Sequence, residues 1–288
     1  MAELLYGKPA ADALTAETRR RADLLRDKGV MPKLVILRCG ENEADGAYIR
    51  GAMKRGGLCG VDVELRTLAE NVSADELARA LEAVNSDNGI HGCLLLRPLP
   101  GHLKAMESKL CALLDPKKDV DGMTPVSAAG MFTGSGQGFP PCTAQACMAL
   151  LDYYHIDSAG KSAAVVGRSA VVGRPAAMLL LARNATVTVC HTGTKDVAAV
   201  TREADIIITA AGAAGSLTAA HVRPGQVVVD VSTNWNGVSL CGDAVFDDVS
   251  QIVEAITPVP GGVGAVTSAV LMAHTVRAAE YLTGEGGL

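Results

Sequence analysis

Hydrophobic positions form a first series in which helical spacing alternates with strand-like runs. Apolar residues recur at helical spacing over residues 8–28, and Gly29 follows as a stop signal. Strand-like runs occupy residues 33–40 and 61–68, and a third lies within residues 89–100 and ends in a proline loop. A helix over residues 46–55 follows the first run, and the capping-box sequence SADE begins the helix after the second. Strands that alternate with helices predict an α/β fold with a parallel sheet.

A second alternating series follows residues 132–143, a segment rich in Gly and Pro that marks the candidate domain boundary. After a helix over residues 143–154, the strand-like runs occupy residues 162–167, 185–190, 204–210 and 226–232. A long amphipathic helix over residues 267–282 is predicted to return to the first domain. We therefore predict two domains, one of residues 1–140 with 268–288 and the other of residues 141–267.

Composition and residue spacing argue against nucleic-acid-binding, membrane-spanning and zinc-binding proteins. The net charge of −5, with only one Trp, five Tyr and three Phe, gives no basic footprint and argues against nucleic-acid binding. The longest apolar run, residues 176–182, is too short to cross a membrane, and residues 1–14 lack the pattern of a secretory signal, so we expect a cytoplasmic protein. The eight cysteines form no C-x-x-C pair and the six histidines show no zinc-type spacing, so we expect reduced thiols and no metal site.

The stretch SAAVVGRSAVVGRP reads as a strand, a glycine turn and a helix, which is the context of a dinucleotide-binding site. Gly167 and Gly173 are six residues apart, with Ser169 at the place of the middle glycine. No carboxylate follows the next strand until Asp196, and Arg168 lies in the turn itself, so the pattern favours the 2′-phosphate of NADP over NAD. The alternative is a plain turn with a solvent-exposed arginine.

Several segments together resemble the FolD-type methylenetetrahydrofolate dehydrogenase/cyclohydrolases. They are the helix around Tyr48, RPLP at residues 97–100, KDVDG at 118–122, PPCT at 140–143, VVGRSAVVGRP at 165–175, TVTVCHTGT at 186–194 and ITPVPGGVGAVT at 256–267. Their order and spacing match the family over essentially the whole chain. The resemblance implies a folate-binding N-terminal domain beside a Rossmann-type NAD(P)-binding domain, usually in a homodimer. It also implies oxidation of 5,10-methylenetetrahydrofolate by NADP, followed by hydrolysis of the methenyl product.

This chain departs from the family at two positions. The family carries a lysine four residues after the tyrosine of its first motif and a glutamine before the proline loop, whereas this chain has Ala52 and Leu96. Lys54 matches a second lysine of many members, and moving it by two helical positions would rotate its side chain by about 200°. We therefore expect that the lysine and its glutamine partner are absent.

The resemblance carries further site residues onto this sequence. It implies Tyr48 and Asp121 as catalytic and substrate-binding residues, Asp121 accepting hydrogen bonds from the pterin ring. Packing for Tyr48 and a turn role for Asp121 are the alternatives. Further implied substrate contacts are Pro260, Gly261, Gly262 and Gly264. Implied cofactor contacts are Gly167, Arg168, Ser169, Gly173, Thr192 and Thr233. Ser232 and Thr233 stand where the family has Gly and Ile.

We therefore expect an NADP-dependent methylenetetrahydrofolate dehydrogenase whose cyclohydrolase activity is lost or strongly reduced, with NAD as the alternative cofactor. One alternative is a fully bifunctional enzyme in which Lys54 or Arg97 assists hydrolysis. A second is a non-catalytic protein that binds folate or NADP. A third is another two-domain dehydrogenase, such as a shikimate-type enzyme, although its lysine and aspartate constellation is not evident in this sequence.

Overall fold

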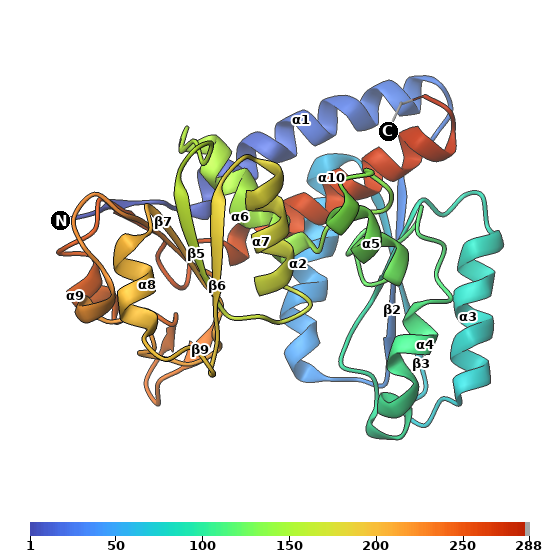
Figure 1. Ribbon diagram of the computed structural model, residues 1–288. Coiled ribbons are helices and arrows are strands. Elements are labelled where there is room, and N and C mark those ends of the chain that lie inside the picture. The colour runs from blue at the N-terminus through green and yellow to red at the C-terminus, as the bar shows by residue number, and fades with distance from the viewer. Residues whose placement is uncertain (286–288) are drawn as a thin grey trace. The chain divides into compact units, whose positions relative to one another are not determined.

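The computed structural model describes residues 1–285, and for residues 43 and 44 the backbone alone (Figure 1). The chain divides into two compact units. Unit 1 comprises residues 1–11 and 143–267, and unit 2 comprises residues 12–142 and those from 268 onward. Each unit is described separately below.

Unit 2 is built on a parallel sheet in the order β3-β2-β4, formed by β2 (Lys33–Cys39), β3 (Asp62–Leu68) and β4 (Gly92–Leu95). Its helices are most of α1 (Gly7–Asp27), α2 (Glu43–Cys59), α3 (Ala74–Ser86), the 3₁₀ helix η1 (Gly101–Met106), α4 (Glu107–Cys111), α5 (Pro125–Thr133) and most of α10 (Gly264–Leu282). Leu34, Val35, Ile36 and Leu37 of β2 are all fully buried, as expected for a central parallel strand covered on both faces. The helices α1 and α10 lie side by side (Figure 1), where Arg21 Nε donates to Glu280 Oε1 at 2.9 Å.

Two buried charges anchor the segment that follows α4. The Lys118 ammonium donates to three carbonyls at the C-terminal end of α3, those of Val84 (2.8 Å), Asn85 (2.9 Å) and Asp87 (2.7 Å). Carbonyls at a helix C-terminus lack donors within the helix and attract a cation, so this contact gives the carbonyls of α3 a donor and the buried ammonium its acceptors. Burial lowers the pKa of Lys118.

Asp119 accepts hydrogen bonds from the free N–H groups at the start of α5. Its carboxylate accepts from the backbone N–H groups of Met123 (2.9 Å) and Thr124 (2.8 Å) and from the Ser127 hydroxyl (2.6 Å). A carboxylate is favoured at a helix N-terminus because the first N–H groups there have no partner within the helix. Lys118 thus attaches the segment before Asp121 to the end of α3, and Asp119 attaches it to the start of α5.

Unit 1 contains a parallel six-stranded sheet in the order β1-β11-β8-β7-β5-β6 and an antiparallel hairpin, β9-β10. The strands are β1 (Glu3–Leu4), β5 (Ser162–Val166), β6 (Thr186–Cys190), β7 (Ile206–Thr209), β8 (Val227–Asp230), β9 (Asn234–Trp235), β10 (Leu240–Cys241) and β11 (Ala255–Ile256). The helices are α6 (Cys142–Tyr153), α7 (Gly173–Ala182), α8 (Val197–Glu203), η2 (Ala219–His221) and α9 (Phe246–Val249). Because β1 pairs with β11, residues 1–11 lie with unit 1, whereas the sequence analysis assigned them to the other domain.

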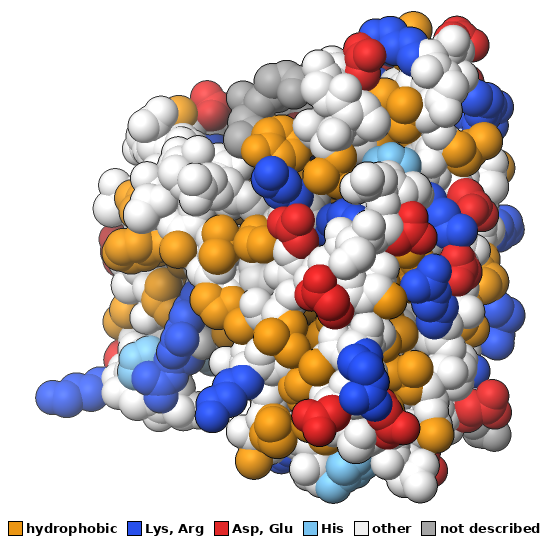
Figure 2. All heavy atoms as spheres, turned by 90° about the vertical axis from the view of Figure 1, so that its right-hand side faces the viewer, with side chains coloured by type: hydrophobic (Ala, Val, Ile, Leu, Met, Phe, Trp, Pro, Cys, Tyr) orange, Lys and Arg blue, Asp and Glu red, His pale blue; other side chains and the backbone are white. Residues whose placement is uncertain are grey.

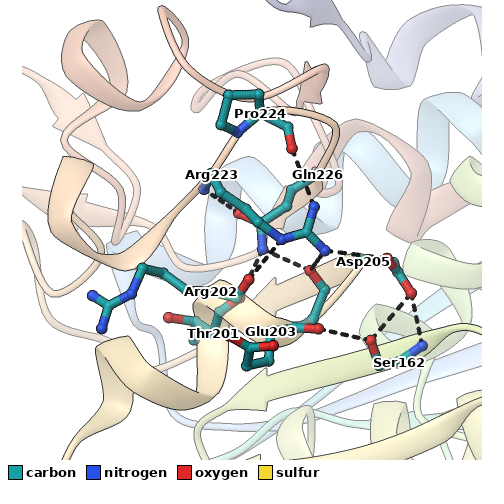
Figure 3. Close-up of polar contacts among 9 residues, drawn as sticks. Ser162, Thr201, Arg202, Glu203, Asp205, Arg223, Pro224 and Gln226 are labelled. Atoms are coloured by element: carbon teal, nitrogen blue, oxygen red, sulfur yellow. Dashed lines mark hydrogen bonds and ion pairs between the residues drawn. The ribbon is translucent and has the colours of Figure 1, made fainter.

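Polar side chains close the C-terminal end of α8 (Figure 3). Gln226, which is fully buried, donates from Nε2 to the carbonyls of Thr201 (2.7 Å) and Ala204 (2.6 Å), and its Oε1 accepts from Arg223 N (2.6 Å). The Arg223 guanidinium donates to Arg202 O (2.7 Å) and contacts Asp205. These bonds join α8 to the start of β8.

The surface carries mixed charges. On the face drawn in Figure 2, acidic and basic side chains are interspersed, and no continuous field of one sign covers that face. Among residues 1–285, no helix is long and apolar enough to serve as a membrane span.

His274 of α10 is almost fully buried in unit 2. Its Nδ1–H donates to Val120 O (2.8 Å), its ring lies 5.1 Å from that of Phe139, and Cys142 Sγ is 3.8 Å from Nδ1. The pKa of His274 is lowered to about 4, because burial and the positive charge of Arg277 outweigh the opposing effect of the bond to Val120 O. The neutral imidazole is therefore part of the core.

We predict that replacing Gln226 with Leu destabilises unit 1. The leucine removes the bonds that Gln226 gives to the Thr201 and Ala204 carbonyls and takes the acceptor from Arg223 N, and the three lost bonds together cost about 3 kcal/mol. Urea denaturation monitored by circular dichroism measures the change. Thr188→Val, on an exposed strand position, is the control and should have little effect. An equally stable Gln226→Leu variant would contradict the assigned role.

We also predict a pH-dependent loss of stability due to His274. Its pKa is lowered from 6.5 to about 4 on folding, so the unfolded chain binds more protons between these values and stability falls as pH drops from 6.5 to 4. The shift corresponds to about 3 kcal/mol. His274→Asn, which keeps an N–H donor but cannot titrate, should flatten this part of the stability profile measured by thermal unfolding.

The exposed His155 provides a matched control. It has a positive φ of 55°, a conformation that asparagine tolerates, so His155→Asn preserves the backbone. This variant should retain the unaltered protein's profile. A profile unchanged in His274→Asn would show that another group controls acid stability.

Candidate functional site

The helix α2 places the residues of the first motif. It begins at Glu43 and ends at Cys59, so the helix predicted over residues 46–55 is present and extends further at both ends. Tyr48 is half-buried and Ala52, one turn later, has 0% exposure. Residues four apart share a helix face, so the position paired with Tyr48 points into the unit and holds only a methyl group.

Neither neighbouring cation occupies that position. Lys54 is exposed, six residues after Tyr48 and away from its face. Arg55 is engaged elsewhere, since its Nη1 donates to Thr15 Oγ1 at 2.9 Å and lies 3.6 Å from Asp12 Oδ1. The structure therefore supports the sequence analysis in giving this face no basic group at the place of Ala52.

Leu96 lies directly after β4. Its backbone N donates to Leu37 O (2.9 Å), which extends the strand pairing, and its half-buried side chain lines a cavity of about 590 Å³. Asp45 of α2 lines the same cavity, so α2 and the end of β4 share this space. A leucine offers neither hydrogen bonds nor proton transfer there.

Asp121 is the acidic residue that the anchored segment presents. It is partly buried, and its Oδ1 accepts from Cys142 N at 3.2 Å. Burial raises the pKa of Asp121. Burial also raises the pKa of Tyr48, and the negative charge of Asp121 contributes to this shift. A carboxylate has about four acceptor positions, which leaves Asp121 able to receive donors from a ligand.

In unit 1, glycines permit the turn between β5 and α7. Gly167 has φ of +123°, and a Cβ there would lie 2.2 Å from Ala210 O. A Cβ on Gly173 would lie 2.2 Å from Gly167 O. The two predicted glycines therefore lie against each other where no side chain fits, and the start of α7 can approach the sheet closely.

Ser169 stabilises the same turn. Its hydroxyl accepts from the backbone N–H of Val172 (3.1 Å) and weakly from that of Gly173 (3.4 Å). Arg168 and Ser169 are exposed, as are Thr192 in the turn after β6 and Thr233 after β8. All four lie beyond the carboxyl ends of their strands, the edge at which α/β sheets bind ligands, but no described contact joins the two threonines to the turn.

The loop after β11 contains the remaining predicted residues. Gly261 has φ of +108°, and its carbonyl accepts from Gly7 N at 2.8 Å. Pro260 is exposed, Gly262 is buried, and Gly264 begins α10. This loop belongs to unit 1, whereas Tyr48 and Asp121 belong to unit 2, so the predicted substrate residues come from both units.

The sequence analysis missed a buried carboxylate in unit 1. Asp243 follows β10, is fully buried, and accepts hydrogen bonds from the loops after β7 and β8. A single aspartate after a glycine carries no spacing signal that would identify it. Among residues 1–285, no group of three or more His, Cys, Asp or Glu residues could hold a metal ion.

Comparison with known families covers nearly the whole chain. Residues 5–121 match the catalytic domain of tetrahydrofolate dehydrogenase/cyclohydrolase, and residues 141–283 match the NAD(P)-binding domain of the same enzymes. The chain is 47% identical over 287 residues to the bifunctional protein FolD of Carboxydothermus hydrogenoformans, with 99% of each chain covered.

Solved structures agree with this relationship. The bifunctional FolD of Campylobacter jejuni is 38% identical with a TM-score of 0.93, covering 98% of this chain and 99% of that one. The methylenetetrahydrofolate dehydrogenase-cyclohydrolase of Trypanosoma brucei, complexed with NADP cofactor and an inhibitor, is 32% identical with a TM-score of 0.89, covering 97% and 98%. With its α/β fold, its glycine turn and its Tyr48 helix, this chain belongs to the tetrahydrofolate dehydrogenase/cyclohydrolase family.

Proposed function

We propose that the protein oxidises 5,10-methylenetetrahydrofolate to 5,10-methenyltetrahydrofolate with NADP, and that its cyclohydrolase activity is lost or strongly reduced. The carrying observation is the fully buried Ala52 one turn after Tyr48. The names of the relatives favour the alternative, since they describe bifunctional enzymes. The residues at the two positions that the resemblance assigns to hydrolysis favour the narrower activity.

Oxidation makes few demands on the side chains of this chain. NADP, when bound, would supply the acceptor for a hydride from the methylene carbon, whose departure the lone pairs of the adjacent folate nitrogens assist. The resulting cation is delocalised, so no proton has to be removed from the carbon. The protein's task is to position the two reactants and exclude water. Asp121 is suited to receive pterin donors and Tyr48 to lie against the ring system.

Hydrolysis requires a proton-transfer group, which oxidation does not. Water must attack the methenyl cation, lose a proton and collapse through a tetrahedral intermediate, and a positioned base contributes about 10²–10⁴-fold to such transfers. The methyl group of Ala52 and the isobutyl group of Leu96 cannot take up a proton. Lys54 is exposed, and a guanidinium such as that of Arg97 stays protonated, so neither is suited to replace the base.

The preference for NADP rests on residues around the turn after β5. Arg168 is exposed there and can pair with a 2′-phosphate. The first carboxylate after β6, that of Asp196, accepts from Ala199 N at 2.8 Å as the N-cap of α8, so it already has a structural partner. The NADP complex of the Trypanosoma brucei relative supports the same preference. The homodimer implied by the resemblance and the cytoplasmic location expected from the sequence stay predictions.

We expect the methenyl product to accumulate when purified protein is mixed with 5,10-methylenetetrahydrofolate and NADP. Its absorbance should rise and then decay at the rate seen without protein, because no side chain accelerates hydrolysis. Enzyme-dependent conversion to 10-formyltetrahydrofolate would instead establish the bifunctional alternative. No signal with NADP or NAD, despite binding of both ligands, would identify a non-catalytic binder.

We further expect the double substitution Ala52→Lys and Leu96→Gln to install hydrolysis. The added base should accelerate decay of the methenyl product by about 10²-fold or more, with oxidation retained. Lys54→Ala is the matched control on the same helix, and it should change neither rate. A double variant that folds, oxidises the substrate and still fails to hydrolyse would show that further residues limit the second reaction.

A further inference from the structure

The loop of residues 210–215 follows β7 and consists of Ala and Gly alone. Such side chains have no polar atoms, so the loop cannot fix its own conformation through them. It lies against the glycine turn, because a Cβ on Gly167 would come within 2.2 Å of Ala210 O. Since β6 and β7 lie on opposite sides of β5, this is the topological switch point of the sheet, where α/β proteins bind dinucleotides.

The carboxylate of Asp243 holds this loop. Its donors come from the end of β7, the loop after β7, the loop after β8 and the start of β9. They are Ala211 N (2.6 Å), Thr209 Oγ1 (3.0 Å) and Ser232 Oγ (2.8 Å) to Oδ2, and Ala213 N (2.9 Å) and Asn234 Nδ2 (3.1 Å) to Oδ1. A buried carboxylate is stable only when several donors surround it, so these bonds fix the loop and the charge together.

Ser232 connects the two loops directly. Its hydroxyl donates to Asp243 Oδ2, and the same oxygen accepts from Gly212 N at 3.1 Å. Gly212 has φ of +67°, a conformation that leaves the loop backbone dependent on outside contacts. Removing the hydroxyl therefore removes one bond from the carboxylate and one from the loop.

We propose that Asp243 and Ser232 are positioning residues for the dinucleotide site, acting through residues 210–213. They hold the backbone beside Gly167 in the one arrangement that leaves the switch-point crevice open to the cofactor. The inference rests on the proposed use of NADP. It does not require either side chain to touch the cofactor, because Asp243 is fully buried and Ser232 acts on the loop through Gly212 N.

The test compares Ser232→Ala, Ser232→Thr and Asp243→Asn in the full chain. Dissociation constants for NADP are measured by titration calorimetry, and KM and kcat are measured for both substrates. Ser232→Ala should raise the Kd and KM for NADP about tenfold, the scale of one lost bond to a charged group. The kcat and the KM for the folate should change less than twofold. Ser232→Thr retains the hydroxyl and should restore affinity, and Asp243→Asn should weaken binding more than Ser232→Ala.

Ser216→Ala is the matched control in the following residues. Within the described part of the chain its hydroxyl is buried without a hydrogen-bond partner, so its loss should leave the Kd for NADP unchanged. If Ser232→Ala binds NADP like the unaltered protein, or if it weakens both substrates equally, the inference is overturned. If the unaltered protein binds neither NADP nor NAD, the proposed function fails as well, so the two failures are distinguishable.

Discussion

The pairing of backbone groups where helices and strands end is the constraint on which both units depend. Regular structure leaves carbonyls free at helix C-termini and N–H groups free at helix N-termini, and several of these groups meet a buried side chain here. Single side chains bond to such groups at three helix ends: Lys118 at the end of α3, Asp119 at the start of α5 and Gln226 at the end of α8. Asp243 does the same for a loop that follows a strand. Each is fully or almost fully buried, so each is stable only because its partners are complete.

The same constraint distinguishes the three charged residues of one motif by the number of their hydrogen-bond partners. Lys118, Asp119 and Asp121 stand within four residues, and the sequence alone does not distinguish their roles. In the structure the first two have full sets of backbone and hydroxyl partners, whereas Asp121 accepts from Cys142 N and retains capacity for a ligand. The number of partners, more than charge or burial, is the observation that favours Asp121 as the proposed recognition residue.

The sequence predicted the larger elements because their patterns are local. The helices α1 and α3, the strands β2 and β3, and the glycine turn at Gly167 all have periodicity, caps or glycines that can be read in a short window. The strand β1 was missed because two residues carry no period and it pairs with β11, about 250 residues away. The helix α2 extends beyond the predicted residues 46–55 at both ends, because neighbours such as Gly56 and Gly57 carry no helical signal yet are helical in the folded chain. Each residue of the candidate site was predicted from the family resemblance. The structure adds the burial of these residues, such as the full burial of Ala52.

The role of Asp243 could not be predicted from the sequence. Its five donors come from Thr209, Ala211, Ala213, Ser232 and Asn234, which no motif groups together. Only folding of the sheet brings the loops after β7 and β8 to one point, so the contact is visible in three dimensions alone.

The two departures from the family pattern can alter one reaction without disturbing the other. Asp121 is held by Cys142 N, and its segment is anchored by Lys118 and Asp119, so its position depends on neither Ala52 nor Leu96. A lysine removed from α2 and a glutamine removed from the end of β4 leave apolar groups that need no partner, whereas either one lost alone would leave the other poorly satisfied. Under the proposed function, paired apolar replacement removes proton transfer while Asp121 and the glycine turn stay in place. For that reason, loss of hydrolysis with retained oxidation is the outcome that this architecture accommodates with the least change.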